Sequence, residues 1–216
     1  MIGDIKHVFN RGINKNDIFT DDSDRKRFVE CLYKFNNEGM ALRSEAESFL
    51  NDPPPQEKIV EILKWVIMPN HFHLLLQEKV EGGISEFVRR LGNGYTKYFN
   101  IKHKRSGFLF QNRTKMVLLE NNRQFLYIPY YIDLNILDIF SPNWKQEGLR
   151  NTDAVIQFMK NYKWSSCPDY FDTGKRDFLA VINKDLFYDL FDLDEKFYQK
   201  ELKDFIKNPV LKFKID

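Results

Sequence analysis

Two histidines one residue apart, His71 and His73, are the side chains of this chain with the clearest chemical potential. They follow an apolar run at residues 59–68 and a turn at 68–70, so we expect them on an extended strand. Side chains alternate between the two faces of a strand, which places both imidazoles on one face and Phe72 on the other. Imidazoles at this spacing can share a divalent metal ion. Two ordinary strand histidines are the alternative interpretation.

A tyrosine and an amide lie one helical turn apart further along the chain. Tyr131 and Asn135 fall in a helical pattern, and residues four apart share one face of a helix. A protonated phenol, with a pKa of about 10, is a poor nucleophile unless a metal ion or a base is near. A metal site beside Tyr131 is therefore chemically sensible. Aromatic packing is the alternative, because other tyrosines occupy the same regions: Tyr95, Tyr98, Tyr127 and Tyr130.

Positive charge is concentrated in residues 84–118, although the whole chain of 216 residues carries a net charge of only +2. Eight basic residues stand against the single acidic Glu86 in that segment, which gives it a net charge of +7. Aromatic residues alternate with these cations, and this mixture suits a surface that follows a phosphate backbone and stacks on unpaired bases. A solvated helix face is the alternative interpretation.

The hydrophobic pattern predicts an α+β fold in which helices pack on an antiparallel sheet. The tight turn at residues 69–70 favours a hairpin. Pro129 falls inside the helix that carries Tyr131, and we expect that helix to begin there or to kink. The expected strands are 5–10, 59–68, 71–77, 108–110 and 116–119, and the expected helices are 20–35, 40–50, 84–99 and one from about 121, with an extended proline loop at 53–55.

Composition places the chain among globular proteins, because 43% of its residues are hydrophobic and 20 are Phe. Cys31 and Cys167 are far apart and have no metal-type spacing, which fits a reduced, cytoplasmic protein. No signal-type segment opens the chain, and no apolar run approaches the roughly 20 residues that a membrane-spanning helix needs. We therefore expect no membrane partner.

Five motifs follow one another along the chain: Asn10-Arg11-Gly12, Met68-Pro69-Asn70-His71-Phe72-His73-Leu74-Leu75-Leu76, Tyr98-Phe99-Asn100, Ser106-Gly107-Phe108-Leu109-Phe110-Gln111-Asn112-Arg113 and Tyr131-Ile132-Asp133-Leu134-Asn135. Together they resemble the single-tyrosine HUH transposases, which include the REP-associated tyrosine transposases and the IS200-like transposases. The resemblance covers about residues 5–140 and extends more weakly to 164–166. The chain departs from the family pattern at Asn112, where a glycine is common, at Ile136, where a proline is common, and in a longer insertion between Asn37 and Lys58.

The resemblance implies a ferredoxin-like or RRM-like catalytic domain at residues 1–145, and a helical extension at 146–216 that packs on it. It implies a transposase that nicks and rejoins single-stranded DNA at hairpins, in the cytoplasm and associated with the nucleoid. His71, His73 and Asn135 would hold Mg²⁺ or Mn²⁺, and Tyr131 would form a 5′-phosphotyrosine and free a 3′-OH. The expected DNA-binding residues are Arg11, Arg89, Arg90, Lys97, Lys104, Arg105, Arg113 and Lys115.

Two other functions are compatible with parts of this pattern. A domesticated hairpin-binding protein would keep the fold without the chemistry, but the intact set of His71, His73, Tyr131 and Asn135 argues against it. A hydrolytic metalloenzyme would need a third carboxylate ligand or a general base, and no such residue stands at a readable spacing. The sequence leaves open whether the protein forms a homodimer.

Overall fold

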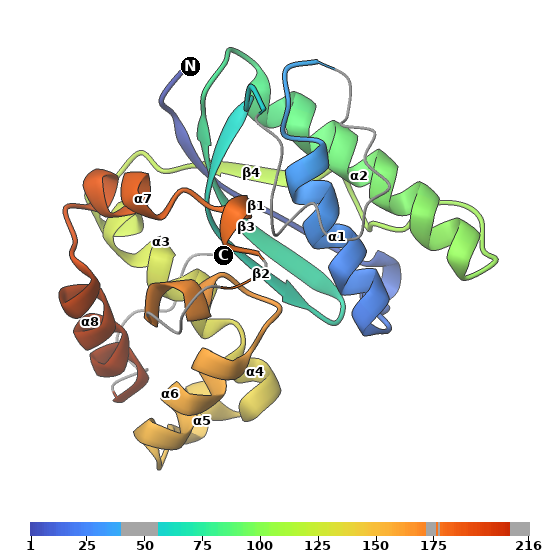
Figure 1. Cartoon of the computed structure of the whole chain (residues 1–216). Helices are drawn as coiled ribbons and strands as arrows, with labels where there is room; N and C mark the ends of the chain where they lie inside the picture. Colours follow the sequence, from blue (N-terminus) through green and yellow to red (C-terminus); the bar gives the residue numbers. More distant parts are fainter. Residues whose placement is uncertain (40–55, 172–175, 177, 208–216) are drawn as a thin grey trace.

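The computed structural model describes residues 1–39, 56–171, 176 and 178–207. The helix expected at 40–50 and the proline loop expected at 53–55 lie outside these residues. The centre of the molecule is a four-stranded sheet with the strand order β2-β3-β1-β4 (Figure 1). All neighbouring strands are antiparallel, as the sequence predicts. The strands are β1 (Ile5–Arg11), β2 (Val60–Met68), β3 (His71–Glu78) and β4 (Lys115–Leu118).

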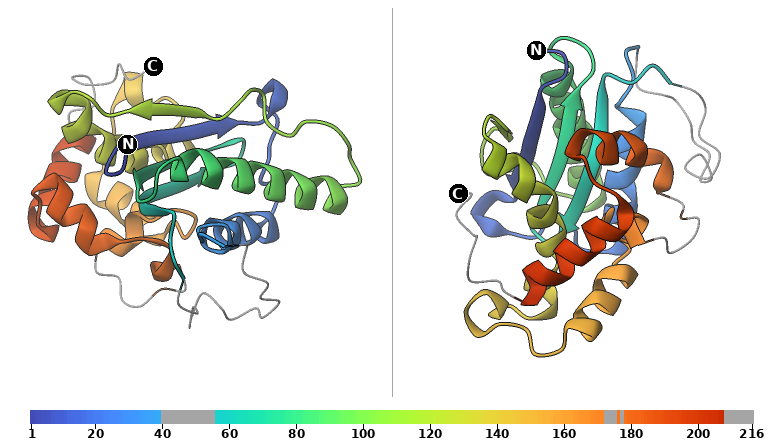
Figure 2. Two further views of the ribbon diagram at one scale, coloured as in Figure 1. Left: turned by 90° about the horizontal axis from the view of Figure 1, so that it is seen from above. Right: turned by 90° about the vertical axis from the view of Figure 1, so that its left-hand side faces the viewer.

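Helices cover both faces of this sheet (Figures 1 and 2). On one face lie α1 (Asp22–Lys34) and α2 (Gly83–Lys102), where Phe28 of α1 packs on Phe72 of β3 at 4.9 Å between ring centroids. The other face is covered by α3 (Asn122–Leu134), where Tyr131 packs on His73 of the same strand. Because side chains alternate along β3, Phe72 faces the layer of α1 and α2, whereas His71 and His73 face the layer of α3.

Most of the helices in the C-terminal part of the chain lie on the α3 side of the sheet, whereas residues 178–181 pack on the α1 side, where the ring of Phe178 lies 6.1 Å from that of Trp65 (Figure 1). Residues 164–166 also pair with the outer edge of β2: the Ile67 amide donates to the Trp164 carbonyl, and the Ser166 amide donates to the Trp65 carbonyl, each over 2.9 Å. This pairing shields one sheet edge. The elements are α4 (Leu137–Phe140), α5 (Trp144–Glu147), α6 (Thr152–Asn161), η2 (Cys167–Phe171), η3 (Leu179–Val181), α7 (Lys184–Phe191) and α8 (Glu195–Lys207).

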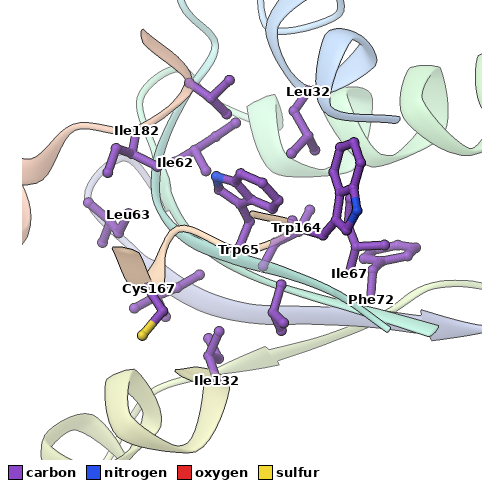
Figure 3. Packing of buried hydrophobic residues seen from close by; sticks show 14 of the residues in the cluster. Leu32, Ile62, Leu63, Trp65, Ile67, Phe72, Ile132, Trp164, Cys167 and Ile182 are labelled. Carbon is purple, nitrogen blue, oxygen red and sulfur yellow. The ribbon is translucent and has the colours of Figure 1, made fainter. Parts of the chain in front are cut away.

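Apolar side chains fill the space on both sides of the sheet. Figure 3 shows Trp65, Trp164 and Phe72 on the side of α1 and α2, and Ile132 with Cys167 on the opposite side. All five side chains are buried. Among the described helices, none has both the length and the apolar character to cross a membrane.

Capping residues set where the helices begin. The side chain of Asp21 accepts the Asp24 amide at the start of α1, and Asn121 accepts the Gln124 amide at the start of α3. The helix α3 begins at Asn122, seven residues before Pro129, so Pro129 lies inside the helix and the expectation that the helix begins at this proline is wrong. Proline has no amide hydrogen, so the Phe125 carbonyl loses its helical donor there.

The prediction of a strand at residues 108–110 is wrong. Phe110 forms only an isolated bridge with Gly12, and Phe108 is 83% exposed. Gly107 precedes them with φ of +85°, which turns the chain out of an extended conformation. An apolar triplet is therefore not enough to form a strand where only one of its residues, Leu109, is buried.

Gly12 closes β1 where the chain passes very close to itself. A Cβ atom at this position would lie 2.1 Å from the Asn16 carbonyl oxygen and 2.7 Å from the Ile18 side chain. The turn that follows is η1 (Ile13–Lys15). Only glycine fits this approach without movement of the backbone, so Gly12 fixes the end of β1 at Arg11.

Candidate active site

The structure brings four predicted site residues together on the face of the sheet under α3. His71 and His73 lie on β3, and their ring centroids are 5.2 Å apart. The ring of Tyr131 meets that of His73 edge-on, at 5.6 Å between centroids and an angle of 89°. Asn135, directly after the last turn of α3, brings its side chain next to the His71 imidazole. One sheet strand and one helix thus supply the whole group.

The two ring nitrogens of His71 have different surroundings. Its Nδ1 lies 2.6 Å from Oδ1 of Asn70, the last residue of the hairpin turn. An amide oxygen can only accept, so Nδ1 of His71 carries the hydrogen and Nε2 keeps its lone pair. The amide nitrogen of Asn135 donates to the Tyr131 carbonyl over 2.7 Å, so Oδ1 is the Asn135 side-chain atom that this hydrogen bond leaves available beside His71.

His73 has a partner that the sequence analysis did not select. Nε2 of His7, on β1, lies 2.8 Å from Nδ1 of His73, and both imidazoles are buried. His7 and His73 are diagonal neighbours on adjacent strands, because His7 pairs with Leu75 and Phe9 pairs with His73. The only available signal was the position of His7 in an expected strand, which does not reveal its register against β3.

Burial keeps these histidines uncharged. It lowers the pKa of His71 to about 4 and of His7 to about 3, while the pKa of His73 falls well below its usual value. The positive charge of Arg11 lowers the pKa of His71 and His73 further. At neutral pH the imidazoles therefore present lone pairs for which protons do not compete.

The environment of Tyr130 differs from that of Tyr131, its neighbour in sequence. Tyr130 is buried against α8, where it stacks on Tyr198 at 4.9 Å and lies 4.6 Å from the ring of Phe205. Burial raises the pKa of Tyr130, and it also raises the pKa of Tyr127. Tyr131 is only half-buried and faces the histidines. Of Tyr127, Tyr130 and Tyr131, the last is therefore the best placed beside the candidate metal ligands.

The donor set fits a small divalent cation. Nε2 of His71 is left free by the contact with Asn70, and Oδ1 of Asn135 is an oxygen ligand of the kind that Mg²⁺ and Mn²⁺ prefer. His73 adds a second imidazole. Within the described residues, no cluster of three or more His, Cys, Asp or Glu side chains forms a metal site, so an amide is required to complete this one. Three protein ligands would leave positions for phosphate oxygens and water.

Several predicted DNA-binding residues lie at the same end of the sheet as this group. Arg11 is exposed and pairs with His71 across β1 and β3, while Lys115 lies 5.5 Å above the ring of Phe9. The exposed Arg113 follows Asn112, whose carbonyl accepts a hydrogen bond from the Asn10 side chain over 3.1 Å. Of these three cations, Arg11 and Lys115 share the sheet face that carries the histidines.

Arg89 and Arg90 lie elsewhere, on α2 and therefore on the opposite side of the sheet. Both donate to the Glu86 carboxylate, and Arg90 also donates to the carbonyls of Asn37 and Gly39. Their charge is partly neutralised by these contacts. The remaining predicted residues follow along α2 and its exit: Lys97 and Lys104 are exposed, and Arg105 donates to the Phe108 carbonyl.

One basic residue near the site was not predicted. Lys145, on α5, lies close enough for its charge to lower the pKa of both His71 and His73, and it forms a salt bridge with Asp138 over 3.3 Å. It lies outside the segment of concentrated positive charge. Sequence alone gave no sign that α5 returns to the histidines.

Comparison with known proteins gives a match to a family model and matches to solved structures. Residues 43–135 match the model of the family described as IS200-like transposases, and this range contains His71, His73, Tyr131 and Asn135. A solved structure of a REP-associated tyrosine transposase bound to a REP hairpin is similar over 80% of this chain and 81% of that chain, with 15% sequence identity and a TM-score of 0.47. No curated protein sequence matches the chain.

Proposed function

We propose that this chain is a transposase of the IS200-like family, whose model matches residues 43–135, and that it cleaves and rejoins single-stranded DNA through Tyr131. The observation that carries the proposal is the contact of the Tyr131 ring with His73, together with the contact of Asn135 with His71. A nucleophile and three candidate metal ligands thus share one face of the sheet. The substrate that suits this site is hairpin DNA with an unpaired flank.

In the proposed reaction the phenolic oxygen of Tyr131 attacks the scissile phosphorus. A bond forms between that oxygen and phosphorus while the bond to the 3′ oxygen breaks, which leaves a 5′-phosphotyrosine and a 3′-OH. The phenolic proton passes to solvent, and the departing 3′ oxygen takes one up. A divalent cation held by His71, His73 and Asn135 would supply Lewis-acid polarisation of the phosphate. Because the phosphotyrosine retains the energy of the phosphodiester, a second 3′-OH can reverse the step.

The cations near the site would hold the DNA strand during this reaction. Arg11 and Lys115 are exposed beside the histidines and can contact phosphates on either side of the scissile bond. Because the imidazoles at the centre are neutral, the positive charge of the site comes from the side chains around them, which include Arg11, Lys115 and Lys145. The strand would therefore cross the sheet end between β1 and β4.

We predict that metal binding requires the histidine pair. His71→Ala and His73→Ala should each remove detectable Mn²⁺ binding and cleavage of a labelled hairpin oligonucleotide, because each removes one ligand. His103→Ala is the matched control, since His103 pairs with Asp24 of α1, on the sheet face opposite to the candidate metal ligands. Mn²⁺ titration followed by electron paramagnetic resonance measures the binding. Full cleavage by the double variant in the presence of a chelator would contradict the metal assignment.

The two groups of cations should contribute differently to DNA binding. Neutralising Arg11 and Lys115 together should reduce the slope of log K against log salt by roughly 1.4, because each lost contact with a single strand removes about 0.7. Neutralising Arg89 and Arg90 should change the slope much less, because Glu86 already pairs with both. Fluorescence anisotropy at several salt concentrations measures both slopes. Equal slopes for the two double variants would contradict this arrangement.

A further inference from the structure

The hydrogen bond between His7 and His73 has no role in the reaction proposed above. Nε2 of His7 and Nδ1 of His73 are 2.8 Å apart, and the two residues are only 3% and 5% exposed. The two rings are nearly parallel, with an interplanar angle of 13°. His7 also stacks on Phe9 at 4.8 Å, and the Tyr131 ring meets it edge-on at 5.7 Å. Packing and this hydrogen bond therefore hold both rings in one orientation.

A single hydrogen must lie between these two nitrogens, and it can belong to either ring. If Nδ1 of His73 donates it, Nε2 of His73 keeps its lone pair. If Nε2 of His7 donates it instead, a neutral His73 carries its hydrogen on Nε2 and cannot offer that atom to a cation. The identity of the donor thus decides whether His73 can act as a ligand through Nε2.

We propose that His7 is a positioning residue, which accepts the hydrogen on Nδ1 of His73 and so holds Nε2 of His73 as the free donor atom. This inference rests on the proposed metal site of His71, His73 and Asn135. Asn70 has the same relation to His71, because its Oδ1 lies 2.6 Å from Nδ1 of that ring. Both candidate ligands would then present the same nitrogen. Histidine ligands generally donate their second hydrogen to such a partner, and its loss weakens metal binding about 10- to 100-fold.

Two substitutions separate this role from simple packing. His7→Phe keeps a flat ring against Phe9 and His73 but removes the acceptor nitrogen. His7→Gln places an amide oxygen near the former position of Nε2, so it can accept the same hydrogen. A purely structural role would make both variants less stable and leave the hydrogen on His73 where it was.

The first measurement is nitrogen-15 NMR of the imidazoles in the full, metal-free chain at neutral pH. We expect the hydrogen of His73 on Nδ1 in the wild-type chain and in His7→Gln, and its transfer to Nε2 in His7→Phe. A wild-type His73 with its hydrogen on Nε2 overturns the proposal. This result needs no variant, so it holds even if His7→Phe does not fold.

The second measurement is titration with Mn²⁺ alone, followed by electron paramagnetic resonance. We expect His7→Phe to bind Mn²⁺ about 10- to 100-fold more weakly than the wild-type chain, and His7→Gln to recover most of this loss. An unchanged affinity in a folded His7→Phe variant overturns the proposal. Absence of Mn²⁺ binding by the wild-type chain would refute the proposed metal site instead, while the NMR result would still identify the donor between His7 and His73.

Discussion

Tyr131→Phe is expected to abolish the covalent protein–DNA adduct while the protein still folds and binds hairpin DNA. The substitution removes one oxygen atom, and the ring can keep its edge-on contacts with His7 and His73. Denaturing gel electrophoresis with 5′- and 3′-labelled hairpin oligonucleotides detects the adduct and the free 3′-OH. Peptide mapping of the adduct then identifies the modified residue.

Tyr130→Phe is the matched control, because it removes the same atom from the neighbouring residue. Tyr130 packs on Tyr198 and Phe205 of α8, away from the histidines, so adduct formation should continue. A phosphotyrosine found at Tyr130 or Tyr127 would overturn the assignment. Hairpin binding without any adduct in the wild-type chain would favour a non-catalytic binding protein.

Lys64→Met is expected to cost about 3–5 kcal/mol of folding stability, because it leaves the buried carboxylate of Asp133 without its counter-ion. The Lys64 ammonium is fully buried on β2 and lies 2.8 Å from Oδ2 of Asp133 on α3. Aromatic rings enclose it: its Nζ is 3.6 Å from the ring centroid of Tyr170 and 4.4 Å from that of Tyr198. The Tyr198 hydroxyl also donates to Asp133 over 2.6 Å.

The double variant Lys64→Met/Asp133→Leu should recover much of this loss, because it removes both charges from the interior together. Lys163→Met is the control: Lys163 forms a salt bridge with Asp22 in which both side chains are about 60% exposed, so its removal should cost roughly 0–1 kcal/mol. Urea unfolding followed by circular dichroism measures all three variants. If Lys64→Met were as stable as Lys163→Met, the buried Asp133 carboxylate would not depend on Lys64 for its stability, and the prediction would be wrong.

The hairpin of β2 and β3 could be predicted closely because its signals are local. The apolar run before Pro69 and the alternation around Phe72 determine both strands and the faces of their side chains. The segment at 108–110 was misread because its apolar residues are not buried, and burial depends on what the rest of the chain covers. Pattern alone could not provide that information.

The site was predictable where it depends on spacing within one element. His71 and His73 share a strand, and Tyr131 with Asn135 follow one helix, so each pair could be found from its period. His7 and Lys145 could not be found in this way. The first depends on the register between β1 and β3, and the second on the path of the chain after α3, and both are set by tertiary packing.

The enclosure of Lys64 has a consequence for the order of events during synthesis. Lys64 leaves the ribosome long before Tyr170 and Tyr198, so the nascent chain first exposes an ammonium group that has no aromatic enclosure. Before those rings are present, burial of this charge costs free energy because the ammonium group gives up water without gaining its aromatic contacts. We therefore expect this cost to oppose the docking of α3 on β2. Since α3 carries Tyr131, a half-made chain would hold the proposed nucleophile away from the histidines, and the proposed cleavage of DNA would have to wait until the C-terminal helices have been made.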